Sequence, residues 1–163
     1  MSTAAPPDSS QIVTFRIGDD LFAADIFAVE RVLHFRAPTP IPNVPEWIDG
    51  VIDYQGRVVP VINLRRRFQL PSAASVQETR ILVFSVADEW IAATVDAVLD
   101  VTALDAAALA PPPPLFRGLA AEYLRGVVRR GERLVICLDA ARLLSATERL
   151  ALAEAAEDAP GHG

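Results

Sequence analysis

The feature that most constrains the fold of this chain is an internal repeat. Residues 12–32 align with residues 81–101 at a constant offset of 69 positions, without a gap, and 8 of the 21 aligned residues are identical. Chance would give roughly two identities in such a window. Two more pairs follow in the same order at an offset of 76: 47–51 with 123–127, and 58–63 with 134–139. Two copies are too few for a solenoid, so the repeat indicates two similar small β units that share one interior.

Length, composition and charge narrow the class of protein. With 163 residues and 52% hydrophobic content, the chain can bury a core, as one domain or as two small subdomains. A net charge of −6 argues against nucleic acid or an anionic membrane as a partner. The single cysteine, Cys137, leaves no intramolecular disulfide, which suits a reducing compartment. Because no signal peptide and no run of ~20 apolar residues is found, we expect a soluble, cytoplasmic protein.

The hydrophobic pattern predicts mainly β-structure in the first copy. Apolar and polar residues alternate over 13–17, which is typical of a half-buried strand, and residues 21–24 return as a second strand. Residues 25–35 are ambiguous, because their apolar positions suit one face of a helix while their β-branched residues suit a strand. The proline-rich run 37–45 can be neither a helix nor a central strand, so we expect an extended loop.

A hairpin and a capped helix are predicted next, and both recur in the second copy. Residues 48–62 form the hairpin, in which Gly56 supplies the positive φ that a tight turn requires. Asn63 is the expected N-cap of a short helix at 64–68, and Asp139 caps the equivalent helix of the second copy. The remaining segments are a disordered N-terminal tail at 1–10, a linker at 71–79, a closing helix at about 146–157 and a flexible tail at 158–163.

The chain offers little that could carry catalysis or bind a metal. His34 and His162 are its only histidines, and Cys137 lies inside an apolar strand where a buried structural role is expected. No Cys/His cluster, glycine-rich phosphate loop or nucleophile elbow is present in the sequence. No nucleophile, base and orienting group can be assembled, so we expect no enzyme activity, no metal and no cofactor.

Five segments of the chain, of which 48–68 is the longest, resemble CheW-like domains, the coupling proteins of bacterial chemotaxis. The most characteristic segment is IDGVIDYQGRVVPVINLRRRF, and the resemblance as a whole covers roughly residues 11–152. Other family-like segments are 14–18, 25–26, 122–126 and 134–139. The resemblance implies two SH3-like five-stranded β-barrel subdomains related by a pseudo-two-fold axis, with short helices and a C-terminal helix. The subdomains would span about 12–70 and 80–144, with some exchange of strands across the boundary.

The resemblance also implies a function and partners. Such a protein is a non-catalytic adaptor that links the cytoplasmic tips of methyl-accepting chemoreceptors to a CheA-type histidine kinase, whose regulatory domain has the same fold. It would work in receptor arrays at the inner face of the membrane, without inserting into it. Two alternatives stay open: a stand-alone regulator that competes with the coupling protein, and a small-ligand sensor that uses the groove between the barrels.

The family's receptor and kinase surfaces suggest a set of binding residues, although some of them have simpler interpretations. Val29 lies on an apolar stripe and is equally well explained as core. Gly50 and Gly126 occur at equivalent points of the repeat, so both could serve close packing of strands, an explanation that is weaker for Gly50. The positions that match the groove and its rim are Ile26, Val29, Arg31, Gly50, Gln55, Gly56 and Arg80.

The chain departs from the family at two of these positions. Family members commonly carry an acidic residue in place of Arg31 and an arginine in place of Gln55. These changes are either a neutral exchange on the surface, since exposed ion pairs contribute about 0–1 kcal/mol, or a sign of a changed partner in a secondary chemosensory pathway. The departures leave the adaptor role intact and put the identity of the receptor and kinase in question.

Overall fold

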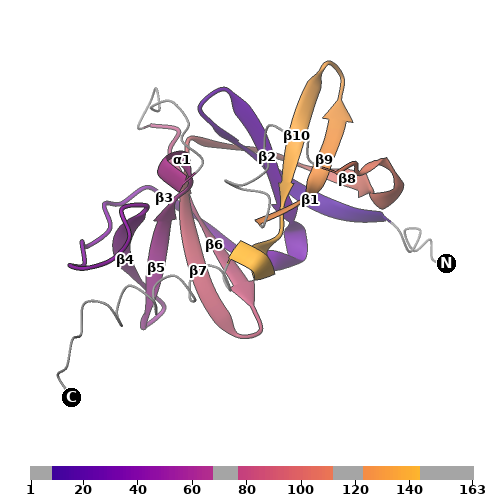
Figure 1. Ribbon diagram of the computed structural model, residues 1–163. Coiled ribbons are helices and arrows are strands. Elements are labelled where there is room, and N and C mark those ends of the chain that lie inside the picture. Colours follow the sequence, from indigo (N-terminus) through magenta and orange to yellow (C-terminus); the bar gives the residue numbers. More distant parts are fainter. Residues whose placement is uncertain (1–8, 68–76, 112–122, 144–163) are drawn as a thin grey trace.

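The protein consists of two five-stranded β-sheets that lie side by side, as a computed structural model describes for residues 9–67, 77–111 and 123–143 (Figure 1). The predicted mainly β fold with two five-stranded units is confirmed. Residues 1–8, most of the predicted linker, the closing helix and the C-terminal tail lie outside the described residues. The first strand begins at Ser9, so the last two residues of the predicted N-terminal tail belong to a strand.

The elements follow one another in the same order in both copies of the repeat. The first copy contains β1 (Ser9–Ile17), β2 (Asp20–Asp25), the 3-10 helix η1 (Ile26–Ala28), β3 (Val29–His34), β4 (Ile48–Tyr54), β5 (Arg57–Asn63) and α1 (Leu64–Arg67). The second contains β6 (Arg80–Val86), β7 (Glu89–Val95), β8 (Ala97–Asp105), η2 (Ala106–Ala108), β9 (Leu124–Arg130) and β10 (Arg133–Leu138). A helix also begins at Ala140 and is described as far as Leu143.

Each sheet takes strands from both copies. Sheet A has the order β8-β1-β2-β10-β9, and sheet B has the order β3-β6-β7-β5-β4. These orders match strand for strand under the repeat, because β8 is the counterpart of β3, β1 of β6, and so on to β9 and β4. Sheet B is therefore one continuous stretch of chain from β3 to β7, while sheet A joins β1 and β2 to the last three strands. The two sheets therefore exchange strands across the boundary between the expected subdomains at about 12–70 and 80–144, since β6 and β7 join sheet B and β8 joins sheet A.

Both sheets are mixed and curled. The central parallel contacts are β10 with β2 and β5 with β7, and all other strand pairs are antiparallel. The proline-rich segment that follows edge strand β3 returns to the opposite edge, where Thr39 and Val51 exchange backbone hydrogen bonds of 2.8 and 2.9 Å. Ala110 and Val127 make the equivalent pair in sheet A at 2.8 Å. Each sheet is therefore curled back on itself.

The ambiguous segment 25–35 is resolved as a short helix followed by a strand. The carboxylate of Asp25 accepts a hydrogen bond from the backbone N–H of Phe27 at 2.9 Å, which caps η1. The chain then enters β3, which pairs with β6 rather than with β2, so η1 is the point where the chain passes from sheet A to sheet B. Local periodicity cannot reveal such a crossing, because it reports neither the partner nor the sheet of a strand.

The predicted hairpin and caps are confirmed. Gln55 and Gly56 form a two-residue turn with φ of 50° and 78°, which matches the twist of the flanking strands. The side-chain oxygen of Asn63 accepts from the N–H of Arg66 at 3.0 Å, and Asp139 repeats this cap with Arg142 at 3.2 Å.

One hydrophobic core is shared by the two sheets, as the repeat indicated. It combines Phe15 and Phe22 of sheet A, whose rings stack at 5.9 Å, with Leu82 and Phe84 of sheet B. Thr14 is only 1% exposed, so β1 is buried on both faces in its middle and the expected half-buried strand is wrong at this position. The physical reason is that the two faces of β1 meet different apolar clusters: Phe15 and Ile17 face the shared core, while Ile12 on the other face packs with Ala23 and Leu104.

Candidate functional site

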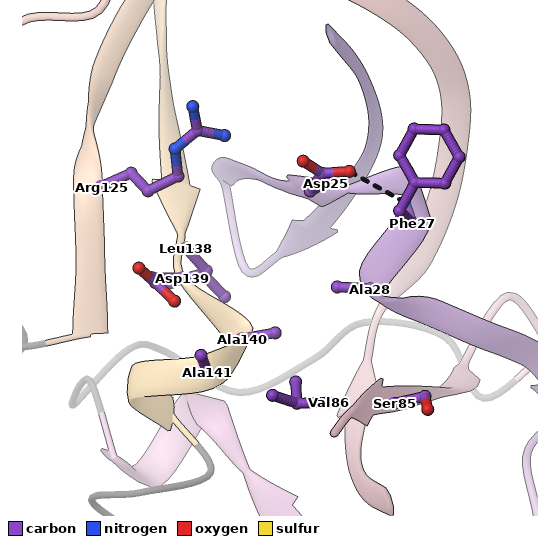
Figure 2. A pocket seen from close by; sticks show the side chains of 10 residues that line it. All are labelled: Asp25, Phe27, Ala28, Ser85, Val86, Arg125, Leu138, Asp139, Ala140 and Ala141. Carbon is purple, nitrogen blue, oxygen red and sulfur yellow. Dashed lines mark hydrogen bonds between the residues drawn. The ribbon is translucent and has the colours of Figure 1, made fainter. Parts of the chain in front are cut away.

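A groove of about 380 Å³ opens between the two sheets. We call it the inter-sheet groove. Figure 2 shows Arg125, Leu138 and Asp139 along one side, and Asp25, Phe27 and Ala28 along the other. Ser85 and Val86 at the end of β6, with Ala140 and Ala141 at the start of the C-terminal helix, complete the lining. The groove is therefore built where η1, β6 and β10 end close together.

The groove is lined mainly by small and apolar side chains. Both of its carboxylates already accept local hydrogen bonds, Asp25 from the N–H of Phe27 and Asp139 from the N–H of Arg142. Arg125 contributes a cation from β9. Phe27 is 89% exposed on the rim, which is unusual for an aromatic side chain of this size. Apolar contact with a partner is the chemistry that this arrangement offers.

The seven residues suggested by sequence do not form one continuous site. None of them lines the inter-sheet groove, although Ile26 lies in η1 between two lining residues. Val29 is half-buried at the start of β3 and packs against the shared core. Arg80 lies at the opposite end of this part of the sheet, paired with His34, and its guanidinium donates to the carbonyl oxygens of Gln77 and Thr79 at 2.9 and 3.0 Å.

Arg31 and Gln55, the two departures from the family, meet at Tyr54. The guanidinium carbon of Arg31 lies 6.0 Å from the centre of the Tyr54 ring, and Gln55 Nε2 donates to the Tyr54 hydroxyl at 3.2 Å. β3 and β4 are opposite edges of sheet B, so this contact depends on the curl of the sheet. Sequence reasoning had placed both residues on one surface, and the structure supplies the ring that connects them.

Two further residues extend this contact into a larger surface. The Trp90 ring lies 5.0 Å from the Tyr54 ring, and the guanidinium carbon of Arg57 lies 4.0 Å from the centre of the Trp90 ring. Such cation–aromatic contacts contribute about 0.5–1 kcal/mol each at exposed sites. We call this set the hairpin-end cluster, because it lies where the β4–β5 and β6–β7 turns meet: Arg31, Tyr54, Gln55, Arg57 and Trp90.

Gly50 and Gly126 are explained by the backbone. Their φ angles are 145° and 153°, a conformation that favours glycine. A Cβ at Gly50 would overlap the carbonyl oxygen of Thr39, and one at Gly126 would overlap that of Ala110. Gly50 and Gly126 therefore have the same structural role in the two sheets. A Cβ at Gly56 would meet no atom within 4 Å, so that glycine is required by its turn rather than by crowding.

The described residues assemble no catalytic or metal-binding group. Burial raises the pKa of the Cys137 thiol, and Arg125 opposes the shift, so this cysteine is a poor nucleophile. His34 is exposed on β3. Within 9–67, 77–111 and 123–143, three or more His, Cys, Asp or Glu residues nowhere gather as a metal site requires. The helices in these same ranges are all too short or too polar to cross a membrane.

Sequence reasoning missed Phe27, Trp90 and Arg57. Phe27 could have been noticed because it interrupts the repeat, with Asp96 at the matching position. Trp90 also differs from its counterpart, Leu21, but the sequence did not indicate that it would face Tyr54 from another strand. Arg57 was assigned to a strand without any role for its side chain.

Two curled sheets, a shared core, an open groove with Phe27 exposed on its rim and an exposed Val58 at the hairpin end define a class of small β protein whose accessible surfaces suit protein partners. The chain belongs to the CheW-like domain family, whose model matches residues 11–148. Members of this family are non-catalytic scaffolds that couple chemoreceptors to the CheA kinase in chemotaxis signalling, and this is the function of the chain.

Individual relatives agree with this assignment over most of the chain. The chemotaxis protein CheW of Treponema pallidum is 31% identical over 154 residues, which cover 92% of this chain and 91% of that protein. The CheW of Klebsiella aerogenes is 33% identical, covering 85% and 83% of the two chains. The crystal structure of the scaffolding protein TtCheW from Thermoanaerobacter tengcongensis superposes with a TM-score of 0.76 at 28% identity, covering 85% of this chain and 90% of that one.

Proposed function

We propose that the chain binds the cytoplasmic tip of a chemoreceptor in the inter-sheet groove and the regulatory domain of a CheA-type kinase at the hairpin end of sheet B. The observation that carries this proposal is the groove itself, with Phe27 exposed on its rim. The protein then acts in the cytoplasm, at the inner face of the membrane where receptor arrays assemble. Five of the seven residues that sequence suggested for binding divide between the two surfaces, with Ile26 and Val29 near the groove and Arg31, Gln55 and Gly56 at the hairpin end. Gly50 and Arg80 belong to neither surface.

The shape of the groove favours a segment of protein over a small molecule. Small-molecule sites bury most of their ligand in a deep cavity, whereas this groove is wide open to solvent. Small side chains such as Ala28 and Ala141 allow an apolar partner to approach the backbone closely. Arg125 supplies one charge that could orient an acidic side chain of the receptor.

The hairpin end of sheet B supports a predominantly apolar contact with the kinase. Val58 is 72% exposed in β5, two positions after the Gly56 turn, and the Tyr54 and Trp90 rings lie at the same end of the sheet. Tyr54 is buried and Trp90 is half-buried, so the surface that this end presents to a partner is Val58 with the exposed Arg57 beside it. Because apolar contacts are screened little by salt, kinase binding should persist when the ionic strength is raised.

Two single substitutions test the proposal and serve as controls for each other. Phe27→Ser should weaken receptor binding on the order of tenfold and leave kinase binding unchanged, while Val58→Ser should do the reverse. Both side chains are exposed, so folding should be preserved. Val101→Ser, which removes an exposed apolar side chain from β8, is a control for loss of apolar surface alone. If both variants weaken both partners equally, or neither partner at all, the division into two surfaces is wrong.

A further inference from the structure

The junction between the sheets has two sides that are equivalent under the repeat. The inter-sheet groove occupies one side. On the other side, the counterpart of Phe27 is Asp96, at the offset of 69. The counterpart of Ala141 is Arg65, at the offset of 76. The two sides can therefore be compared residue by residue.

The side opposite the groove is closed by a buried polar clasp. The carboxylate of Asp96 is 2% exposed and forms an ion pair with the guanidinium of Arg65. Its second oxygen accepts from the N–H of Gly18 at 2.6 Å, and the N–H of Asp96 donates to the carbonyl of Arg16 at 2.9 Å. We use the term clasp for Arg65, Asp96 and Gly18.

The clasp connects one sheet to the other. Arg65 lies in α1, directly after β5 of sheet B, and Gly18 lies in the turn between β1 and β2 of sheet A. Asp96 is the residue at which the chain returns from β7 to β8, and hence from sheet B to sheet A. At the surface of the same side, Arg16 adds an ion pair to Glu78 at 3.2 Å. The Arg65–Asp96 ion pair crosses from the sheet B side of the junction to the start of β8 in sheet A, so it resists a change in the angle between the sheets.

The groove side carries none of these charges at the matching positions. Phe27 takes the place of Asp96 and projects into solvent, and Ala141 takes the place of the long Arg65 side chain. Ser85 stands where Arg16 would form its surface ion pair. The groove is thus the part of the junction in which the polar contacts of the clasp have been replaced by small or outward-pointing side chains.

We propose that Arg65 and Asp96 are positioning residues for the inter-sheet groove, holding the two sheets at the angle that sets its width. A buried ion pair contributes little net stability compared with apolar residues of the same volume, and its best-attested role is to fix one arrangement among several. The consequence for receptor binding rests on the proposed function of the groove. The consequence for the sheet angle does not.

The sheet angle can be measured without any partner. Nitroxide labels at Val32→Cys in β3 and Val101→Cys in β8, with Cys137→Ala to remove the native thiol, report the distance between the sheets by pulsed electron paramagnetic resonance. The variant Arg65→Met with Asp96→Asn removes both charges and leaves neither one buried alone, which favours its folding. We expect a broader or shifted distance distribution in this variant. An unchanged distribution would overturn the proposal.

Measuring receptor and kinase binding by the Arg65→Met, Asp96→Asn variant tests the claim about receptor binding separately from the claim about the sheet angle. We expect receptor affinity to fall on the order of tenfold, a common size for coupling between sites, with unchanged kinase affinity. If the wild-type chain binds no receptor but the distance distribution still changes, the proposed function fails and the positioning role stands. A changed distribution with unchanged receptor affinity would overturn the link between clasp and groove.

A mirror-image design tests the proposal even if the first variant does not fold. Phe27→Asp with Ala141→Arg copies the clasp onto the groove side, where the N–H of Ala87 matches that of Gly18. The control is Phe27→Asn with Ala141→Gln, which changes the same positions without an ion pair. Compared with this control, we expect the Phe27→Asp, Ala141→Arg variant to have a narrower distance distribution between the labels and a weaker affinity for the receptor. Equal distributions and equal affinities in the two designs would overturn the proposal.

Discussion

Gly50 lies against the backbone of Thr39, so that any side chain on Gly50 would overlap the Thr39 carbonyl oxygen. The contact exists because the N–H of Val51, the next residue, donates to the same oxygen at 2.9 Å. The glycine therefore allows the proline-rich segment to join the edge of β4. Its identity is explained by packing, even though its position matches the family's binding surface.

Gly50→Ala and Gly126→Ala should both destabilise the fold. Each requires a backbone conformation that costs on the order of 1–3 kcal/mol for a non-glycine residue, and each adds an overlap with a carbonyl. Chemical denaturation should show losses of at least about 2 kcal/mol. Gly56→Ala, where no atom lies within 4 Å, is the matched control and should cost only about 1 kcal/mol. Wild-type stability of Gly50→Ala would show that this account of the glycine is wrong.

Arg31 and Gln55 should influence the choice of partner. The double substitution Arg31→Glu with Gln55→Arg reverses the charge pattern around Tyr54, and like charges brought together at a contact are penalised. Because both residues lie at the hairpin end, we expect weaker binding of the native kinase regulatory domain, unchanged receptor binding, and a change in stability within about 0.5 kcal/mol. Receptor and kinase affinities of the folded variant are the measurements. Arg129→Gln on the exposed β9–β10 hairpin is the control, because it lowers the net charge by one, as the double substitution does. Unchanged affinity for both partners would mean that the two positions are solvated surface.

Asp100 should make stability depend on pH. The Thr14 hydroxyl donates to its carboxylate at 2.5 Å, and this bond, followed by the hydrogen bond from Arg130, lowers the pKa of Asp100 below its ordinary value of 3.8. Because the pKa is lower in the folded state, the stabilisation is complete above the unfolded-state pKa and is lost as the pH falls through the folded-state pKa.

The test compares wild type with Asp100→Asn by urea denaturation between neutral pH and about pH 2. The free energy of unfolding should fall more steeply in the wild type at the acid end of this range. Thr14→Val should raise the pKa of Asp100 towards 3.8, which a carboxyl titration by nuclear magnetic resonance can follow. Parallel pH profiles for wild type and Asp100→Asn would contradict the assignment.

Local features of the fold were predictable because they depend on neighbours in the sequence. The turn at Gly56 and the caps at Asn63 and Asp139 each use a side chain or glycine within a few residues of the backbone that it serves. The shared core followed from the repeat, since two similar apolar patterns need a common interior.

Some exchange of strands was expected, but local reasoning could not say which strands are exchanged. Alternation of apolar residues shows that a strand exists and which face is buried, but not which strand pairs with it. The parallel contact of Ile136 with Phe22 joins residues from the two ends of the chain and depends on the crossing at η1. For the same reason, the contacts of Arg65 and Gly18 with Asp96 could not be predicted from the sequence. Asp96, a charged residue within an apolar run where the repeat has Phe27, was the available signal.

The central claim is that this chain physically couples a receptor to a kinase, and co-sedimentation tests it directly. Vesicles that carry the cognate receptor should bring down the CheA-type kinase when this protein is present, and much less of it when the protein is omitted. Phe27→Ser and Val58→Ser should each reduce the sedimented kinase, the first by losing the receptor and the second by losing the kinase. Equal amounts of sedimented kinase with and without the wild-type protein would contradict the account.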